Sequence, residues 1–296
     1  MIRLKNLIKQ FKKHRVLDSL DLGIEKGERI ALVGSNGAGK TTMIRCILGE
    51  YTHEGVVEVG GQSPRKHRSD VLKRIGFVPQ LPPPLKMPVA ELLRFSAAVS
   101  GTKAADMEAI AHRLGLDVKQ FAGQPFHKLS GGQKQKLLIA IALGRNAEVL
   151  IMDEPAANLD PEARHVFFDL LAERSANATM LISSHRLDEV AALVNRVIEL
   201  DRGRVVLDDR VADAPLTGIL RCEVTLRRAD PAIAKALGEW GFQPKDGEGG
   251  LEWRGEVSGA DRLRFMGLVS RYVGLLTRVH FEERAVEQAR LHAVAS

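Results

Sequence analysis

Alternating apolar and polar residues open the chain. Residues 2–10 and 16–26 alternate in this way, which predicts two short strands that pair antiparallel and expose one face. The run Ile30–Val33 is apolar at every position, as is typical of a strand buried on both faces. A glycine-rich segment follows it, and the stretch Met43–Leu48 is helix-like. The N-terminal part therefore predicts a small antiparallel sheet, a buried strand and a helix.

The next region changes from strands to helices. Residues 56–61 predict a strand and a turn, and residues 74–80 predict a strand that ends in the polar Gln80. Three prolines, Pro82–Pro84, cannot continue a ladder of hydrogen bonds, so the chain is expected to run extended and leave the sheet. From Val89 to Leu143, periodic apolar residues punctuated by glycines predict a mainly helical subdomain.

Strands and helices alternate again after the helical region. Residues 148–152 and 179–183 are typical of buried strands, and residues 164–174 between them of a helix. This is the pattern of a parallel sheet with a crossover helix. Residues 197–200 and 204–207 flank a turn and predict a strand pair that closes the domain.

A smaller domain is expected after about Thr217, where the composition shifts. Its pattern alternates strands at 219–227, 251–256 and 276–281 with helices at 230–241, at 259–272 and from Glu283. We therefore predict a small α+β domain over residues 218–296. The chain has no long heptad array and no internal repeat, which argues against coiled-coil arms.

The glycine-rich segment between the buried strand and the helix carries the strongest chemical signal. It fills every position of a phosphate-binding loop, with the residues Gly34, Ser35, Asn36, Gly37, Ala38, Gly39, Lys40, Thr41 and Thr42. Strand, glycine loop and helix form the context that this motif requires. The glycines let backbone amides approach phosphate oxygens closely, and the helix directs its positive N-terminus at the anion.

Three side chains of this loop have expected roles toward a nucleotide. Lys40 supplies a mobile charge for the β- and γ-phosphates, and the Thr41 hydroxyl is placed to ligate Mg²⁺. Thr42 is expected to contact the α-phosphate. Taken alone, the motif leaves open a glycine-rich turn that binds nothing, and the motifs further along the chain make that alternative less favourable.

Two carboxylates follow the buried strand at 149–152. The end of such a strand emerges beside the phosphates, so Asp153 is expected to hold Mg²⁺ and Glu154 to polarise the attacking water. Paired acids after an apolar strand are moderately specific, and in isolation a surface turn explains them equally well.

Further motifs identify a family. With Leu129-Ser130-Gly131-Gly132-Gln133, Gln80, Asn158-Leu159-Asp160 and Ser184-His185, the chain resembles the nucleotide-binding domains of ATP-binding cassette (ABC) ATPases over roughly residues 1–215. The resemblance implies a P-loop NTPase fold of the ABC type, α/β with a mixed sheet core and a helical subdomain at about 81–145. This domain would span residues 1–217.

The resemblance also implies functions for residues outside the phosphate loop. Ser130, Gly131 and Gly132 of one protomer would bind the γ-phosphate of ATP held by the other, and Gln133 would belong to the same nucleotide site. Gln80 would sense the γ-phosphate through Mg²⁺ and couple chemistry to motion, His185 would orient the water with Glu154, and Asp160 would link the two sites. Phe11 matches the aromatic residue that stacks on adenine, although an apolar core role explains it too. His185 likewise has a structural alternative as a core histidine.

Composition adds few constraints. The formal charge of +6 is explained by solvated surface clusters, with contact to a partner or lipid headgroups as the alternative. Two cysteines without metal-ligand spacing are expected to be buried hydrophobes in a reducing compartment. No run approaches the roughly 18 apolar residues of a membrane span. With a start that resembles a strand rather than a signal peptide, the sequence predicts a cytosolic protein.

Together these features predict an ATPase subunit of a membrane transporter, with ATP and Mg²⁺ as ligands. We expect a homodimer that sandwiches two ATP and drives a separately encoded permease from the inner face of the membrane. A permease segment would dock near residues 81–100, so charge or bulk at Leu85 or Met87 is expected to uncouple transport. The small tail resembles the C-terminal extension of exporter-type ATPases more than the larger β-rich regulatory domain of sugar importers, a resemblance that implies export. The tail is expected to stabilise the dimer. The alternative is a soluble ABC ATPase that acts on nucleic acid or ribosomes; no nucleic-acid partner is expected.

Overall fold

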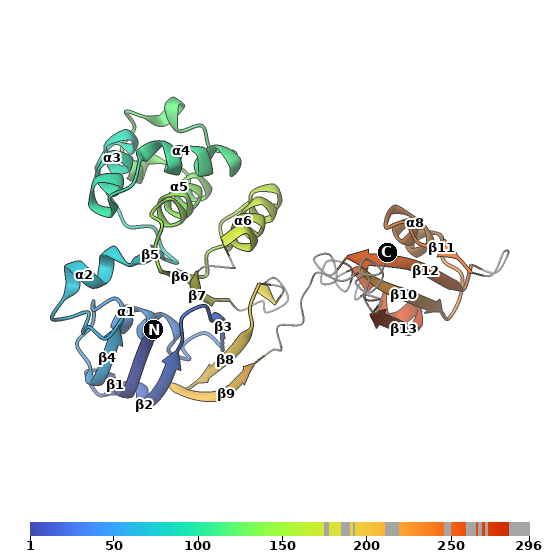
Figure 1. The fold of residues 1–296 in the computed structure, drawn as a ribbon, viewed down its shortest axis with the longest axis horizontal. Coiled ribbons are helices and arrows are strands. Elements are labelled where there is room, and N and C mark those ends of the chain that lie inside the picture. Colours follow the sequence, from blue (N-terminus) through green and yellow to red (C-terminus); the bar gives the residue numbers. More distant parts are fainter. Residues whose placement is uncertain are drawn as a thin grey trace, which may run out of the picture. The chain divides into compact units, whose positions relative to one another are not determined.

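The computed structural model describes residues 1–174, 178–184, 190–191, 193–210, 219–245, 250–258, 265, 268–269 and 272–283. The chain divides into two compact units, residues 1–211 and 212–296 (Figure 1). In these described residues, no helix combines the length and the apolarity that crossing a membrane demands.

A six-stranded sheet forms the centre of the first unit. Its strands lie in the order β5 (Ile75–Val78), β6 (Val149–Asp153), β7 (Thr179–Ser183), β3 (Arg29–Val33), β8 (Arg196–Asp201) and β9 (Arg204–Arg210). The first five strands are parallel, and β9 joins β8 antiparallel. The parallel strands and the closing strand pair confirm the sequence prediction.

A three-stranded antiparallel sheet covers part of this centre. It contains β2 (His14–Ile24), β1 (Ile2–Phe11) and β4 (Glu54–Val59) in that order, as the alternating pattern predicts for the first two strands. Helix α1 (Lys40–Ile47) packs between the two sheets, because its buried residues share one apolar cluster with β1, β2, β4 and β3. The short helix α2 (Arg68–Lys73) precedes β5.

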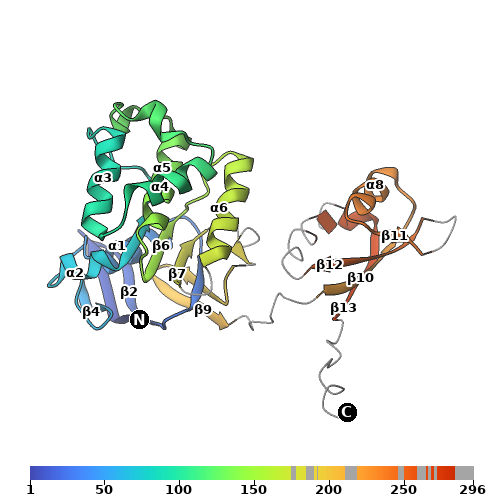
Figure 2. The ribbon, with the colours of Figure 1, turned by 45° about the horizontal axis from the view of Figure 1, so that its top comes forward.

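Helices form a separate layer of the first unit. They are α3 (Val89–Ser100), α4 (Ala104–Arg113) and α5 (Gly131–Gly144), with the 3-10 turns η1 (Val118–Phe121) and η2 (Phe126–Lys128) between α4 and α5 in the chain. Figure 2 shows α3, α4 and α5 close together. Apolar residues of these elements form their own core around Phe126, which confirms the predicted helical region. Helix α6 (Pro161–Arg174) packs against the central sheet instead.

Helix α5 belongs to two cores at once. Leu137 and Ala140 lie in the helical core, whereas Ile139 and Leu143 pack with β6 and β7. Gly76 of β5 allows this helix to approach, since a Cβ there would lie 2.7 Å from the Ala142 carbonyl oxygen. Helix α5 therefore packs against both the helical core and the central sheet, and so connects the two.

A buried ion-pair network joins the start of β8 to its neighbours. The Arg196 guanidinium donates from Nε and Nη2 to Asp208, both at 2.7 Å, and from Nη1 to Glu28 at 2.7 Å. The side chains of Arg196 and Glu28 are 7% and 11% exposed. Arg210, at the end of β9, also pairs with Glu28. These ion pairs hold β9, the last strand of the first unit, against β8 and against Glu28.

Replacing Arg196 by Met is expected to destabilise the first unit by about 3–5 kcal/mol, because Glu28 would keep a buried charge with reduced compensation. Urea unfolding at pH 7 measures the loss. Arg113→Met, which breaks an exposed ion pair with Glu173, is the matched control and is expected to lose far less stability.

The same ion pairs predict a pH dependence, because Arg196 lowers the pKa of Asp208 in the folded state. The Asp208 carboxylate therefore stabilises the fold at any pH above its unfolded-state pKa. This stabilisation is lost as the pH falls through the folded-state pKa. The stability difference between wild type and Arg196→Met should therefore shrink in acid; a constant difference would contradict this account.

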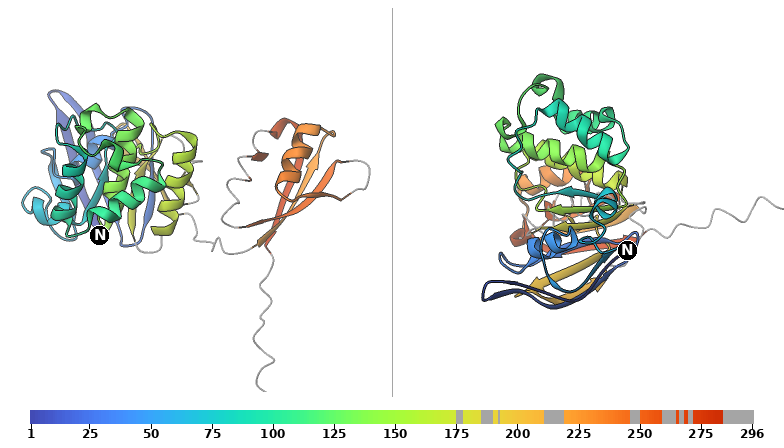
Figure 3. Two further views of the ribbon diagram at one scale, coloured as in Figure 1. Left: turned by 90° about the horizontal axis from the view of Figure 1, so that it is seen from above. Right: turned by 90° about the vertical axis from the view of Figure 1, so that its left-hand side faces the viewer.

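The second unit is an antiparallel sheet covered on one face. Its strands lie in the order β11 (Gln243–Pro244), β12 (Glu252–Ser258), β10 (Ile219–Leu226) and β13 (Leu276–Glu283), and helix α8 (Pro231–Glu239) connects β10 to β11 (Figure 3). The 3-10 turn η4 (Val273–Leu275) precedes β13. This strand order is that of the split β-α-β arrangement of ferredoxin-like domains.

The apolar core of this unit is aromatic. The Phe265 ring stacks on Phe242 with centroids 4.8 Å apart and meets Trp240 edge-on, and Val224 and Trp253 of the sheet join the same core. The predicted helix at 259–272 lies largely outside the described residues. The helix predicted from Glu283 is wrong at its first residue, because Glu283 ends β13, and its other residues lie outside the described part.

Candidate functional site

The phosphate loop, residues 34–42, leads from β3 into α1. Gly34 and Gly39 have φ values of 143° and 110°, and a Cβ would lie 2.3 Å from the Leu200 carbonyl oxygen at the first and 2.8 Å from the Leu17 side chain at the second. Only glycine fits both positions. No side chain caps the N-terminus of α1, and its first turn holds no acidic residue. The backbone amides at this helix start are therefore available to an anion.

A cavity of about 360 Å³ collects most of the predicted site residues. It is lined by Ser35, Asn36, Gly37, Ala38, Gly39, Lys40, Thr41, Thr42, Gln80, Asp153, Glu154 and Val16. The loop, the end of β5 and the end of β6 thus meet in one place, as the parallel sheet dictates. The sequence pattern does not single out Val16, which comes from β2; its only signal is that it is an apolar residue on a strand that precedes the loop in the chain.

Lys40 is held inside the loop. Its side chain is largely buried, and Nζ donates to the carbonyl oxygens of Gly34 at 2.5 Å and Ser35 at 3.2 Å. A phosphate in the cavity would offer the ammonium a charged acceptor in place of these neutral carbonyls. Such charge-assisted hydrogen bonds are the stronger kind.

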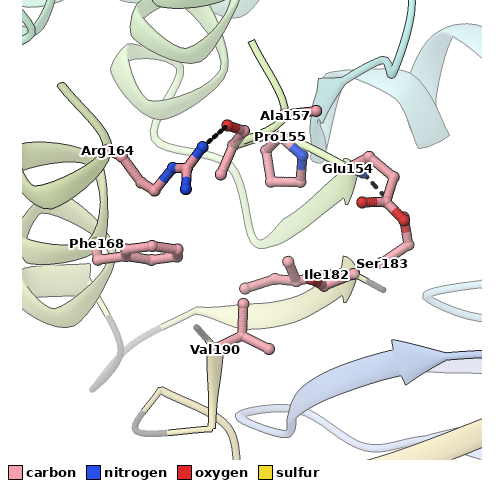
Figure 4. Close-up of a pocket in the computed structure, with 10 residues that line it drawn as sticks. Glu154, Pro155, Ala157, Arg164, Phe168, Ile182, Ser183 and Val190 are labelled. Carbon is pink, nitrogen blue, oxygen red and sulfur yellow. Dashed lines mark hydrogen bonds between the residues drawn. The ribbon is translucent and has the colours of Figure 1, made fainter. Parts of the chain in front are cut away.

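The two carboxylates at the end of β6 differ in environment. Asp153 is buried and accepts a hydrogen bond of 2.6 Å from the Ser183 hydroxyl. The same hydroxyl accepts 2.9 Å from the backbone N–H of Glu154, and Figure 4 shows these two residues facing each other. Glu154 has a φ of 49°, in the left-handed region where non-glycine residues are uncommon. Ser183 was missed by the sequence reasoning, since its partner depends on the register between β6 and β7.

A smaller pocket of about 150 Å³ is lined by Glu154 and the three residues that follow it, together with residues of α6 and β7. Figure 4 shows Phe168 and Arg164 of α6 facing Ile182 and Val190 across it. Arg164 donates to the Ala156 carbonyl oxygen at 3.3 Å. These contacts support the backbone that follows Glu154.

The signature segment, residues 129–133, starts helix α5. Ser130 caps the helix by accepting from the Gln133 backbone N–H at 3.2 Å, and the Gln133 side chain accepts from the Ser130 N–H at 2.9 Å. Ser130 and Gly131 are exposed. None of the predicted residues Ser130–Gln133 lines the cavity that holds the phosphate loop. Within one chain, the structure therefore does not bring the two motifs together.

The first turns of α5 are tied to the segment between Glu154 and α6. The buried Gln135 amide donates to the Pro155 carbonyl oxygen at 2.9 Å, and Lys136 Nζ lies 2.7 Å from Asp160 Oδ2. The Lys136 ammonium holds the pKa of the Asp160 carboxyl below its usual value. Asp160 also caps α6 by accepting from the Ala163 N–H. Movement of α5 would therefore reach the residues that follow Glu154.

Two predicted residues stand apart from the cavity. Phe11 ends β1, is 39% exposed and does not line the cavity; its ring meets Tyr51 edge-on at 5.2 Å between centroids, and Lys9 Nζ lies 4.6 Å above it. This surface position is not a core position, which removes the structural alternative for Phe11. His185 lies outside the described residues.

Comparison with known proteins places these features in a family. Residues 17–157 match the family described as ABC transporter. A Streptomyces avermitilis protein named as an ABC transporter ATP-binding protein is 37% identical over 223 residues, which cover 73% of this chain and 82% of that protein. The Nod factor export ATP-binding protein I of Ralstonia nicotianae is 31% identical over 80% of this chain and 76% of its own length. The tungstate uptake system ATP-binding protein of Peptoclostridium acidaminophilum is 32% identical over 69% of this chain and 96% of its own length.

The fold agrees with solved structures of the same class. A dimeric ATP-binding cassette in a post-hydrolysis state, bound to ADP and phosphate, matches with a TM-score of 0.63 and 25% identity over 71% of this chain and 99% of that one. This match confirms the predicted P-loop fold of the ABC type. The phosphate loop, the cavity around it and these relatives together assign the chain to the ATP-binding proteins of ABC transporters.

Proposed function

We propose that the chain is the ATP-hydrolysing subunit of a membrane transporter, working as a homodimer that drives a separately encoded permease. The observation that carries this proposal is the single cavity in which the phosphate loop meets Gln80, Asp153 and Glu154. Phosphate-binding amides, oxygen ligands and a carboxylate base are the groups that phosphoryl transfer to water requires.

The phosphate loop would hold the nucleotide. Its backbone amides and the N-terminus of α1 face the phosphates, and Lys40 exchanges its two carbonyl acceptors for β- and γ-phosphate oxygens. The Thr41 hydroxyl, the Gln80 amide oxygen and the Asp153 carboxylate line the same cavity, and these oxygen donors fit Mg²⁺. When bound, Mg²⁺ would offset negative charge on the β- and γ-phosphates.

Glu154 would act as the base toward water. The Ser183 hydroxyl bonds both to Asp153 and to the backbone of Glu154, so it keeps the metal ligand and the base in fixed relation. By the family resemblance, His185 would donate to the γ-phosphate and help to orient the water. Phe11 would stack on adenine, for which its half-exposed ring beside Lys9 is suited.

The second half of each site would come from a partner subunit. Ser35–Gly37 of the phosphate loop are exposed, as are Ser130 and Gly131 of the signature segment, yet the two motifs do not share a cavity in one chain. Two chains facing each other would bring Ser130–Gln133 of one to the ATP of the other, with Asp160 at the junction. Since ATP then connects the two subunits, its hydrolysis would open the dimer. The change between the closed and open dimer would drive the conformational change of the permease.

We propose export as the direction of transport, from the inner face of the membrane. The match to the Nod factor export protein covers 80% of this chain, whereas the tungstate uptake protein is matched over 96% of its own length but only 69% of this chain. The uptake protein therefore leaves little length for a counterpart of the second unit, while the export protein resembles more of the chain. The transported molecule would be selected by the permease.

The helical layer carries the surface proposed for the permease. Leu81, Phe95 and Val99 are exposed apolar side chains, at 77%, 56% and 44%. Leu85, proposed from the sequence as a test position, packs partly against the helical core, and its carbonyl oxygen accepts from the His127 N–H. Phe95 is therefore the sharper position, since a change there leaves the fold intact.

Phe95→Glu is expected to separate the chain from its permease without changing its own ATPase rate. Tagged chain purified from detergent-solubilised membranes of the source cells should carry an integral membrane protein in stoichiometric amount, and Phe95→Glu should reduce that amount at least about tenfold, a loss of about 1.4 kcal/mol or more. Val206→Glu, at an exposed apolar residue of β9, is the matched control. If wild type carries no membrane protein, or both variants keep it, the proposed docking surface is wrong.

A further inference from the structure

The edge of the sheet in the second unit is formed by β13. Among the described residues, β13 pairs with β10 along one side only. The opposite edge is the two-residue strand β11, which contains Pro244 and so limits further pairing. An edge strand presents a row of backbone N–H and C=O groups that can pair with another chain.

β13 lacks most of the features that usually prevent such pairing. It has eight residues, contains no proline, glycine or lysine, and keeps a regular register with β10 from Arg278 to Glu283. Natural edge strands are usually protected by shortness, proline, bulges or charged side chains, lysine above all. Between Arg278 and Glu283, β13 has only the charged side chains, and because Arg278 and Glu282 are of opposite sign they can match those of a second copy.

The two faces of β13 differ in chemistry. Val279 and Phe281 face the apolar core, opposite Val224 and Cys222 of β10. Arg278, His280 and Glu282 are exposed on the other face. In an antiparallel pair, directly opposed residues lie on the same face, so two copies of β13 must align core face with core face.

One two-fold register matches the charges. If the axis passes through His280, Arg278 lies opposite Glu282 of the partner subunit, and this ion pair occurs twice. On the core face the same register sets Val279 opposite Phe281 of the partner subunit, an aromatic and β-branched pair of the favourable kind.

The neighbouring registers are poorer. An axis through Val279 sets Arg278 opposite His280 and forms no ion pair between carboxylate and guanidinium. An axis through Phe281 sets Glu282 opposite His280, so among the described side chains it too forms no ion pair between carboxylate and guanidinium. The sequence of β13 therefore favours one self-complementary alignment.

We propose that β13 pairs antiparallel with β13 of a second copy of this chain, about an axis at His280, and so joins two tail sheets into one of eight strands. This contact requires no nucleotide. It would hold two chains together while the ATP-dependent contact between the first units opens and closes.

Cysteine cross-linking of the full chain tests the contact. His280→Cys puts two thiols opposite each other at about 4.5–5.5 Å between Cα atoms, a separation that a disulfide spans. The native Cys46 and Cys222 are buried, and burial raises their pKa to about 11 and about 12, so they contribute little background. Under mild oxidation without nucleotide, most of the His280→Cys chain should become a covalent dimer.

Controls fix the register and separate this contact from the nucleotide site. Arg278→Cys and Glu282→Cys chains should cross-link to each other when mixed and not with themselves, and Lys235→Cys on the exposed side of α8 should remain monomeric. Adding Lys40→Ala to His280→Cys should leave the yield of covalent dimer unchanged, because the contact does not require nucleotide. The cross-linking result therefore stands whether or not the proposed ATPase function is correct. A His280→Cys chain that cross-links no faster than Lys235→Cys would overturn the proposal, and self-linking of Arg278→Cys would overturn the register.

Discussion

Replacing Glu154 with glutamine is expected to lower phosphate release by at least about a hundredfold while ATP stays bound. General base catalysis contributes about 10²–10⁴-fold, and the amide cannot take the proton of the attacking water. Glutamine keeps the size of the side chain and the backbone bond from Glu154 to Ser183. Steady-state phosphate release and the amount of ATP retained by the purified protein measure the two effects.

Glu162→Gln provides the matched control, because Glu162 is an exposed carboxylate in the first turn of α6. Its turnover should equal that of the wild type. Phosphate release by Glu154→Gln within about tenfold of the wild-type rate would remove Glu154 from the role of base, since a missing general base costs more than that.

Replacing Lys40 with alanine is expected to weaken ATP binding by about 10–100-fold, because a hydrogen bond to a charged group contributes about 1.5–3 kcal/mol. The loop itself should keep its shape, since Gly34 and Gly39 set the backbone and Lys40 adds only two side-chain bonds to it. Calorimetric titration with Mg²⁺-ATP measures the affinity, and thermal unfolding without nucleotide checks the fold.

Lys103→Ala, at the exposed start of α4, is the control for Lys40→Ala and should bind ATP normally. An unchanged affinity in Lys40→Ala would mean that the cavity around the phosphate loop is not the ATP site.

Local chemistry explains what the sequence could predict. The phosphate loop is a contiguous segment whose glycine positions follow from backbone conformation, so its residues and its helix were predictable one by one. Asp153, Glu154 and Gln80 lie at or just after the ends of strands, and the rule that parallel strands end at one edge was enough to bring them to the same cavity. The strand pair at β8 and β9 was predictable from the turn between them.

Contacts between distant segments were not predictable. Ser183 meets Asp153 only through the register of two strands, and Lys136 meets Asp160 only because the first turns of α5 lie beside the segment that leads into α6. The two-residue β11 is too short to give a pattern, and nothing in the apolar alternation fixes the strand order of the second unit. The sequence ends β13 too early, because the adjacent acidic residues Glu282 and Glu283 break the alternation and are typical of the first turn of a helix.

The central claim is that each ATP site is shared by two chains, and ATP retention by mixed dimers tests it most directly. Glu154→Gln chains with different tags are co-expressed, purified through both tags and desalted after loading with ATP. One pair carries Lys40→Ala on one chain and Gly132→Asp on the other, which leaves one complete shared site. The second pair carries both changes on one chain and leaves the partner otherwise intact.

If sites are shared, the first pair retains ATP and the second does not, because in the second pair each remaining motif faces a disabled one. Retention by the second pair and not by the first would mean that a single chain forms the complete site, and would contradict the account.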